Sequence, residues 1–212
     1  MPTQGSTDDG FVSVATEDTW AAFRANTGGK SSGYSNQTDT IIAKHLGTNV
    51  YQYHQIWMQF DVSGHTQLPT SATLNFTVES INDSPTLTIL KGTWAGSGHS
   101  HGANILNACN FSTPYATTNL SMAVQSYSIA LNSDALADIR DDNQLNIMLV
   151  EHHMMSDSTP PTSGEDFQIE IAMTDNSNST KRPRLLVVDP TSTHIISLSS
   201  GLIQVKSGKV VF

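Results

Sequence analysis

Apolar and polar residues alternate along much of the chain, and a period of two residues predicts β-strands that bury one face. In residues 55–63 the alternation places Ile56, Met58 and Phe60 on one face and Trp57 on the other. The same pattern recurs throughout the sequence. It predicts eight strands, at residues 38–46, 55–63, 71–80, 84–94, 126–131, 144–153, 167–173 and 184–189.

Short segments rich in Gly, Pro, Asn and Asp separate these strands, which favours an antiparallel all-β fold. We therefore expect a jelly-roll β-sandwich with one short helix and a C-terminal β-arm. The helix is predicted over residues 132–142. Asn132 or Ser133 can cap it, and Leu136 and Ile139 fall on one helical face.

Two segments lie outside the strand pattern. Residues 92–119 are weakly patterned and are expected to form a long loop that serves as a functional or interaction surface. Residues 190–212 are apolar but too short to be stable alone. We expect residues 1–189 to form the sandwich and 190–212 to form an arm that packs on a neighbouring subunit. The predicted assembly residues are Ile195, Ile196, Leu198, Leu202, Ile203, Val205, Val210, Val211 and Phe212.

Composition restricts the possible partners. The net charge is −9, and the one basic run, 181–184, is short, whereas a nucleic-acid-binding surface needs clustered Lys and Arg. No run approaches the roughly 18 apolar residues of a membrane helix. Only 14% of residues are charged, and the many hydroxyl and amide side chains suggest an extracellular or virion protein. Because MPTQGSTDDG has no secretory signal, we expect a virion location, with a secreted location as the alternative.

Several motifs occur in a familiar order. They are EDTWAAFRA (17–25), GYSN (33–36), QIWMQFDVSG (55–64), SATLNF (71–76) and RPRLLVV (182–188). This order, over roughly residues 11–189, resembles the DNRLRE-type, disaggregatase-related β-sandwich modules, which look like carbohydrate-binding modules. The resemblance implies a non-enzymatic jelly roll that serves as an accessory or adhesive module on secreted or phage structural proteins. The sequence HQIW replaces the arginine usual before the "FD" strand, and residues 190–212 have no counterpart.

A glutamate and two histidines follow an apolar run in LVEHHMMSDS (149–158). In a continuing strand Glu151 and His153 point to one face and His152 to the other, so the adjacent histidines cannot share one ion. Together with His99 and His101 they have the ligand types of a zinc site, but no HEXXH or paired CXXC spacing is present. We interpret the motif as a core strand that leads into a polar rim loop.

A second metal candidate is the loop TDNSNST (174–180), which is rich in side-chain oxygens. Asp175, Asn176 and Asn178 are the predicted ligands of a structural Ca²⁺. Turns stabilised by Asn and Asp side chains explain the same composition. No other cofactor is expected.

Aromatic residues are the candidates for sugar binding, because a ring offers a flat apolar face to the C–H face of a sugar. The alternative is that most of these rings belong to the core or to an interface. The predicted ligand-binding rings are Trp20, Tyr34, Tyr51, Tyr53, Trp57 and Trp94.

Catalytic motifs are absent from the sequence: it contains no GXSXG, GXGXXG or phosphate-binding Gly loop. The acidic pairs Asp141/Asp142 and Glu165/Asp166 are more typical of solvated turns than of glycosidase carboxylates. We therefore expect no enzymatic activity. The predicted function is that of a phage virion structural protein, in the head decoration or the tail, which contacts other virion proteins and copies of itself. The alternative is a carbohydrate-binding module that recognises a surface glycan.

Overall fold

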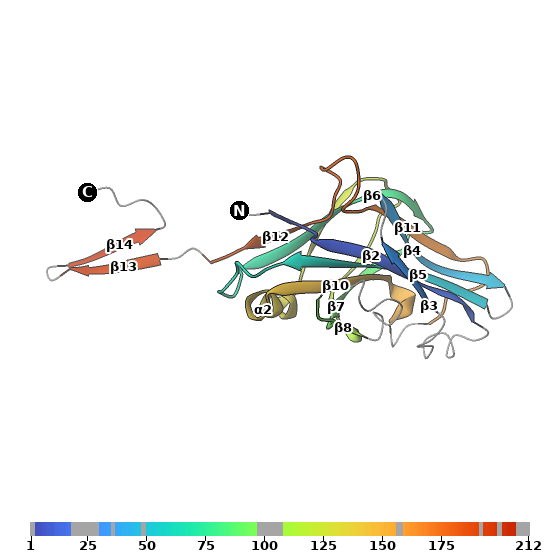
Figure 1. The fold of residues 1–212 in the computed structure, drawn as a ribbon, viewed down its shortest axis with the longest axis horizontal. Coiled ribbons are helices and arrows are strands. Elements are labelled where there is room, and N and C mark those ends of the chain that lie inside the picture. The colour runs from blue at the N-terminus through green and yellow to red at the C-terminus, as the bar shows by residue number, and fades with distance from the viewer. Residues whose placement is uncertain are drawn as a thin grey trace.

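The computed structural model of the protein describes residues 3–17, 30–34, 37–47, 50–96, 108–155, 159–190, 193–198 and 201–206. An elongated β-body carries a C-terminal hairpin that extends away from it (Figure 1). The elements are β1 (Thr3–Gly5), β2 (Asp8–Glu17), β3 (Lys30–Tyr34), β4 (Thr38–Gly47), β5 (Val50–Asp61), β6 (Ser71–Asn82), β7 (Thr86–Gly92), β8 (Cys109–Asn119), β9 (Ser126–Ala130), α2 (Ser133–Asp141), β10 (Gln144–Glu151), the 3₁₀ turn η2 (His152–Met154), β11 (Asp166–Ala172), β12 (Arg184–Val188), β13 (Thr193–Leu198) and β14 (Gly201–Lys206).

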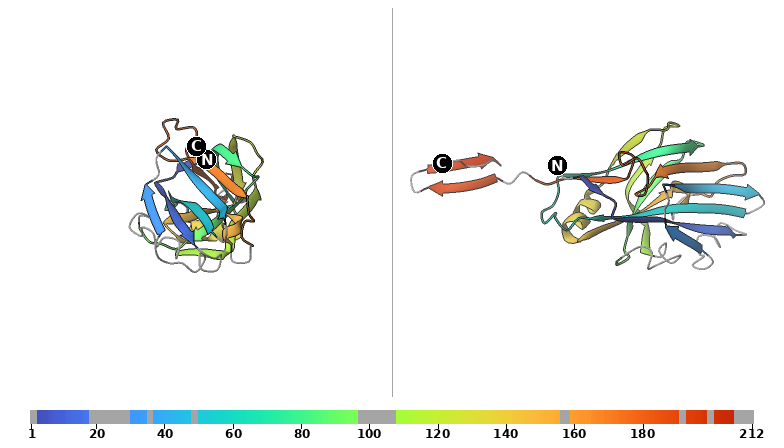
Figure 2. Two further views of the ribbon diagram at one scale, coloured as in Figure 1. Left: turned by 90° about the vertical axis from the view of Figure 1, so that its right-hand side faces the viewer. Right: turned by 45° about the horizontal axis from the view of Figure 1, so that its top comes forward.

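Eight strands form two antiparallel layers. Their orders are β4–β11–β6–β9 and β5–β10–β7–β8. In each layer, strands from the two halves of the chain alternate, which is the arrangement of a jelly roll. Figures 1 and 2 show β6 and β11 over β10 and β7. The predicted all-β, antiparallel jelly-roll sandwich is therefore confirmed.

The predicted helix is α2, whose first turn is capped by the Asn132 side chain. This side chain accepts a hydrogen bond from the Ala135 backbone N–H at 3.2 Å. Ala135 and Ile139 are the buried residues of the helix. Among the described residues, no helix has the length and apolar composition needed to cross a bilayer.

The main core fills the space between the layers. Ile56, Met58 and Phe60 of β5 lie in the same buried cluster as Leu74 and Phe76 of β6, and each is at most 2% exposed. The faces predicted from the alternation are thus the faces that pack. Burying a side chain of this size contributes about 1.5–3 kcal/mol to stability.

A second cluster covers the outer face of the β5–β10 layer. Trp57 of β5 and Met148 of β10 pack there with Trp94, which follows β7, and with Met154 and Met155 at the end of η2. Both faces of β5 and β10 are consequently buried. Burial on both faces explains why β10 is almost continuously apolar rather than alternating.

Each of the two strands β5 and β6 divides one of its edges between two partner strands. The first half of β5 pairs with β4, from Gly47↔Val50 to Ile42↔His54, and residues 56–61 pair with β10. The other edge of β5 carries β2, which pairs in turn with β3. In the same way, β6 pairs with β12 through residues 71–75 and with β11 through residues 78–82.

One strand, β8, lies in the segment that was predicted to be a loop. It is the edge strand of its layer and pairs with β7 on one side only. A proline such as Pro114 is tolerated in an edge strand, because the missing N–H can face the side that has no partner strand. The register shifts so that Ile89 pairs with Ala116 and Leu90 with Pro114, which leaves Tyr115 as an extra residue. This bulge interrupts the alternation that would have identified the strand.

The last described strands, β13 and β14, pair from Thr193↔Lys206 to Leu198↔Gly201. They form the C-terminal β-arm expected from the sequence, and the arm lies apart from the sandwich (Figure 1). Its strands carry six of the predicted assembly residues, and Val210, Val211 and Phe212 lie outside the described residues.

Candidate ligand-binding cleft

A cleft of about 450 Å³ opens where β7 ends and β10 begins. One wall is residues 91–96, the other is residues 142–146, and Tyr115 of β8 also lines the cleft. The first wall is the end of β7 and the residues that follow it, and the second runs from the turn after α2 into the start of β10. The cleft therefore lies beside the second hydrophobic cluster, at one end of the β5–β10 layer.

Buried amides fix the first wall on the sheet. The Gln59 Nε2 atom donates to the Gly96 carbonyl at 2.6 Å and to Asn146 Oδ1 at 3.0 Å. The Asn146 Nδ2 atom donates to the Trp94 carbonyl at 2.6 Å. The Gln59–Asn146 and Asn146–Trp94 bonds are buried and therefore protected from water.

The ring of Trp94 folds back over Gly92. A Cβ atom at Gly92 would lie only 1.9 Å from the nearest Trp94 ring atom, so only glycine fits under the ring. The ring also meets Trp57 edge to face, with 6.5 Å between the ring centroids. Glycine at position 92 thus permits the packing that shapes the cleft.

A small charged network lies at the edge of the cleft. Lys91 Nζ is 2.5 Å from Asp138 Oδ1, and the Tyr115 hydroxyl donates to Asp138 Oδ2. Burial raises the pKa of Tyr115, and its hydrogen bond to Asp138 raises the pKa further. Tyr115 is therefore a fixed hydrogen-bond donor at physiological pH. Asp138 projects from α2, whose cap residue Asn132 also donates from its Nδ2 atom to the Pro114 carbonyl at 2.9 Å.

The rest of the lining offers both donors and acceptors to a ligand. Asp142 and Asn143 are exposed, and Gln144 and Lys91 are half-buried. Besides these amides the lining carries one side chain of each charge, Lys91 and Asp142, a combination that suits an uncharged ligand with many hydroxyl groups. The cleft has the size of many small-molecule sites.

The predicted sugar-stacking rings are mostly elsewhere. Tyr51, Tyr53, Trp57 and Trp94 are at most 7% exposed and belong to the second hydrophobic cluster. A ring that is buried to this degree has no open face for a sugar, so these four rings form core, which was the alternative. Of the four, only Trp94 lines the cleft.

The other two predicted rings cannot be placed in this way. Trp20 lies outside the described residues. Tyr34 is the last residue of β3, and its side chain is outside the described part of the chain. Both stay predictions.

The Glu151-His152-His153 motif forms a structural cap. Glu151 is 1% exposed, and its Oε2 atom accepts from the His153 backbone N–H at 2.8 Å and lies 2.6 Å from His153 Nδ1. Its Oε1 atom accepts from the Thr86 N–H at 3.2 Å. The hydrogen bond to Glu151 raises the pKa of His153 against the opposing effect of burial. The strand was expected to lead into a polar rim, but Glu151 is buried, because it caps the 3₁₀ turn that follows.

The possible zinc ligands His99 and His101 lie outside the described residues. Within the described part of the chain, no three His, Cys, Asp or Glu residues are grouped as a metal site would require. The zinc interpretation therefore gains no support from Glu151 and His153, whose polar atoms bond to each other.

The calcium candidates form turns. Asn176 Oδ1 accepts from the Asn178 N–H at 3.0 Å, and Asn178 Oδ1 accepts from the Thr180 N–H at 3.1 Å. The Asn176 Nδ2 atom donates to the Gln37 carbonyl at 2.9 Å. These bonds use the oxygens that calcium would need, so turn formation alone explains the composition. Calcium binding at Asp175, Asn176 and Asn178 stays a prediction.

Three of the four acidic residues considered for catalysis have hydrogen-bond or ion-pair partners within the described part of the chain. Asp141 pairs with the neighbouring Arg140 at 2.6 Å, and Glu165 accepts from the Thr162 N–H. Asp166 forms an ion pair with Lys44 at 2.6 Å. Asp142 is the member that lines the cleft.

Sequence reasoning did not identify the network of Lys91, Tyr115 and Asp138. These residues come from two strands and a helix, and no local motif connects them. Lys91 lay in the predicted strand 84–94, Asp138 in the predicted helix 132–142 and Tyr115 in the predicted loop 92–119. These predictions did not indicate that the three residues meet.

No protein-family model and no curated protein matches the sequence. The resemblance to DNRLRE-type modules rests on the order of short motifs and stays a prediction.

Proposed function

We propose that this chain is a non-enzymatic structural protein of a phage virion, which assembles through its C-terminal arm. The observation that carries the proposal is the β13–β14 hairpin, which lies apart from the sandwich (Figure 1). An isolated two-stranded hairpin is marginally stable in water at best. The hairpin therefore needs a partner, and another copy of the chain is the partner we infer.

The geometry favours an intermolecular role. The outer edge of each arm strand can accept a further strand, and strand addition is a common mode of assembly. The base of the arm is held in place, because His65 Nδ1 lies 2.9 Å from Asp189 Oδ2. His65 is 4% exposed, so this contact fixes the last sandwich residue before the arm.

The virion assignment draws on composition and on the resemblance. A low charged fraction of 14% and a sequence rich in Ser, Thr, Asn and Gln are typical of extracellular and virion proteins. The resemblance to modules of phage structural proteins supports the same role. Head decoration and tail are both compatible with a jelly roll that has an assembly arm.

Deleting residues 190–212 is expected to abolish assembly and to leave the sandwich folded. Size-exclusion chromatography with light scattering will compare the full chain with a chain that ends at Asp189. We expect an oligomer and a folded monomer, respectively, and regular closed assemblies of the full chain in negative-stain electron microscopy. Identical masses for the two chains would refute assembly through the arm.

Point substitutions provide a matched control. Ile196 and Ile203 are register partners across the hairpin. The double substitution Ile196→Asp/Ile203→Asp is expected to dissociate the oligomer. Ser197→Asp introduces one charge at the next position of β13, which is polar in the native sequence, and is expected to weaken assembly less.

A second candidate function is carbohydrate binding in the cleft at β7 and β10. The observation that favours it is the combination of the Asn143 and Gln144 amides in a cleft of about 450 Å³ whose edge is held by the hydrogen bond from Tyr115 to Asp138. A glycan array followed by calorimetry is expected to identify a neutral oligosaccharide ligand. Its affinity should fall at least tenfold in Asn143→Ala/Gln144→Ala and be unchanged in Gln125→Ala, on the distant loop before β9. An array without any bound glycan would count against this function.

A further inference from the structure

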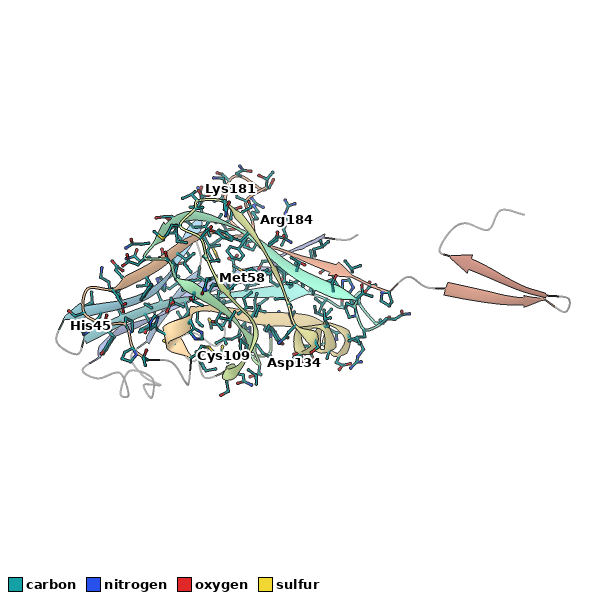
Figure 3. The ribbon with its side chains drawn as sticks, turned by 180° about the vertical axis from the view of Figure 1, so that it is seen from behind. His45, Met58, Cys109, Asp134, Lys181 and Arg184 are labelled. Carbon is teal, nitrogen blue, oxygen red and sulfur yellow. The ribbon has the colours of Figure 1, made fainter. Side chains whose placement is uncertain are left out.

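A second cleft, of about 320 Å³, lies between the end of β1 and the start of β12. Gly5 and Ser6 line one side, and Ser179, Arg182 and Arg184 line the other. Figure 3 shows Arg184 where β12 begins and Lys181 on the preceding loop. The cleft is separate from the one at β7 and β10, since the two share no lining residue.

The charges around this cleft are unusual for the molecule. Six Lys and Arg side chains are described by the structure, and four of them form ion pairs with carboxylates. The paired residues are Lys44, Lys91, Arg140 and Lys181, with Asp166, Asp138, Asp141 and Glu79, respectively. Among the described side chains, Arg182 and Arg184 are the two cations without a carboxylate partner, and both line the same cleft. In a chain of net charge −9, two such arginines side by side point to an external anion.

Both guanidinium groups are held in position by backbone carbonyls. Arg182 Nε donates to the Asn176 carbonyl at 2.9 Å, and Arg184 Nη2 donates to the Ser179 carbonyl at 2.7 Å. A guanidinium has five N–H groups, so each arginine keeps four for other acceptors. Positioned arginines bind carboxylate, sulfate and phosphate groups through paired hydrogen bonds.

An acidic side chain that contacts the lining residue Thr174 is already occupied. Asp9 is 7% exposed, and its Oδ2 atom accepts from both the backbone N–H and the hydroxyl of Thr174. Asp9 therefore faces Thr174 rather than either arginine. Glu79 is paired with Lys181 at 2.8 Å.

The cleft also has room for a ligand. Gly5 pairs with Arg184 across β1 and β12, so both positions face the same side of the sheet. A Cβ atom at Gly5 would meet no atom within 4 Å, which leaves open space beside the Arg184 side chain. The cleft volume of about 320 Å³ is in the range of small-molecule sites, and Ser6 and Ser179 of the lining carry hydroxyl groups.

We infer that this cleft binds the oxyanion of an acidic saccharide, either the carboxylate of a uronate or a sulfate ester. Arg182 and Arg184 hold the anion, and hydroxyl-bearing residues of the lining contact the sugar ring. This inference does not depend on assembly through the arm. It also differs from the neutral ligand proposed for the other cleft.

The test is a titration of the full chain, followed by NMR chemical shifts, with three probes at low salt: a glucuronate-containing disaccharide, a sulfated disaccharide and a neutral disaccharide. We expect binding of at least one acidic probe, no binding of the neutral one, and a loss of affinity as salt is raised. The first two probes distinguish carboxylate from sulfate recognition. Equal binding of the neutral probe, or no binding of either acidic probe, would overturn the inference.

Four variants locate the site. Arg184→Gln is expected to weaken binding at least tenfold, whereas Lys181→Gln, which removes the same charge three residues away, is expected to change it less than twofold. Gly5→Glu places a carboxylate in the cleft and should abolish binding, while the neutral Gly5→Gln should retain more of it. Because the two Gly5 variants leave both arginines in place, they answer the question even if Arg184→Gln fails to fold. Equal losses in Lys181→Gln and Arg184→Gln would indicate a diffuse charge effect and contradict a built site.

Discussion

Replacing Gly92 by alanine is expected to destabilise the protein by about 3 kcal/mol, at the upper end of typical overpacking effects. The added Cβ would lie 1.9, 2.3 and 2.5 Å from three atoms of the Trp94 ring, so the ring must leave its position. Its departure would expose the face of Trp57 that it covers and displace the wall of the cleft. Urea denaturation followed by tryptophan fluorescence measures the change in the free energy of unfolding.

A double-mutant cycle shows whether the ring is the cause. Once Trp94 is replaced by alanine, Gly92→Ala should have little further effect, because the clash no longer exists. Gly64→Ala is the matched control, since a Cβ atom there meets nothing within 4 Å. If Gly92→Ala proved as mild as Gly64→Ala, the Trp94 ring would not pack over Gly92 in solution.

Replacing Asp39 by asparagine is expected to stabilise the protein by about 2–4 kcal/mol at pH 8 and to have little effect at pH 4. Burial raises the pKa of Asp39 to about 7, and the charges of Asp9 and Glu170 act in the same direction. One of its oxygens accepts from the Thr40 N–H at 2.8 Å, whereas the other has no hydrogen bond among the described residues. Asparagine keeps the first bond and carries no charge.

The sign of this prediction follows from the pKa of Asp39 in the two states. In the unfolded chain the group ionises near pH 4, whereas in the folded protein it stays protonated up to about pH 7. Its contribution is therefore most favourable below pH 4 and is lost as the pH rises through 7, by about 1.4 kcal/mol for each unit of difference. Asparagine removes this dependence on pH.

An ion pair between Asp39 and His54 would have the opposite effect, because it would stabilise the charged form of Asp39. The His54 Nε2 atom is 3.7 Å from Asp39 Oδ1, a distance that permits an ion pair. Burial lowers the pKa of His54 to about 4, however, so both groups favour their neutral forms between pH 4 and 7. Thermal unfolding of Asp39→Asn at pH 4, 6 and 8 separates the two cases, with the exposed Asp61→Asn as control. Destabilisation by Asp39→Asn near neutral pH would show that the ion pair forms.

Period-two alternation predicted the strands whose two faces differ in environment. The Ile56, Met58 and Phe60 face of β5 is core, as the pattern indicated. The alternation also placed Trp57 on the opposite face, but it carries no information about what lies over that face. That cover comes from Trp94, Met154 and neighbouring loop residues far along the chain, which only the tertiary structure brings there.

The cleft and β8 also depend on tertiary contacts that the local sequence does not predict. The bulge at Tyr115 breaks the alternation of β8, and it brings the Tyr115 hydroxyl to Asp138 of α2. Local sequence predicted α2 to within a residue at each end, because capping and helical spacing are short-range properties. The pairing of Lys91 with Asp138 depends on how the helix sits against β7, which no short-range pattern specifies.

The divided edge of β6 has a consequence for synthesis on the ribosome. Residues 71–75 of β6 pair with β12, which is made more than a hundred residues later, and β12 also holds β1. While the nascent chain grows, this half of β6 is without its final partner, and β1 has none. Folding of the sandwich therefore cannot be completed co-translationally until residues 184–188 have emerged, and pairings this distant in sequence are slow to form. A chain stalled before β12 would present an unpaired strand edge, the kind of surface that chaperones and aggregation compete for.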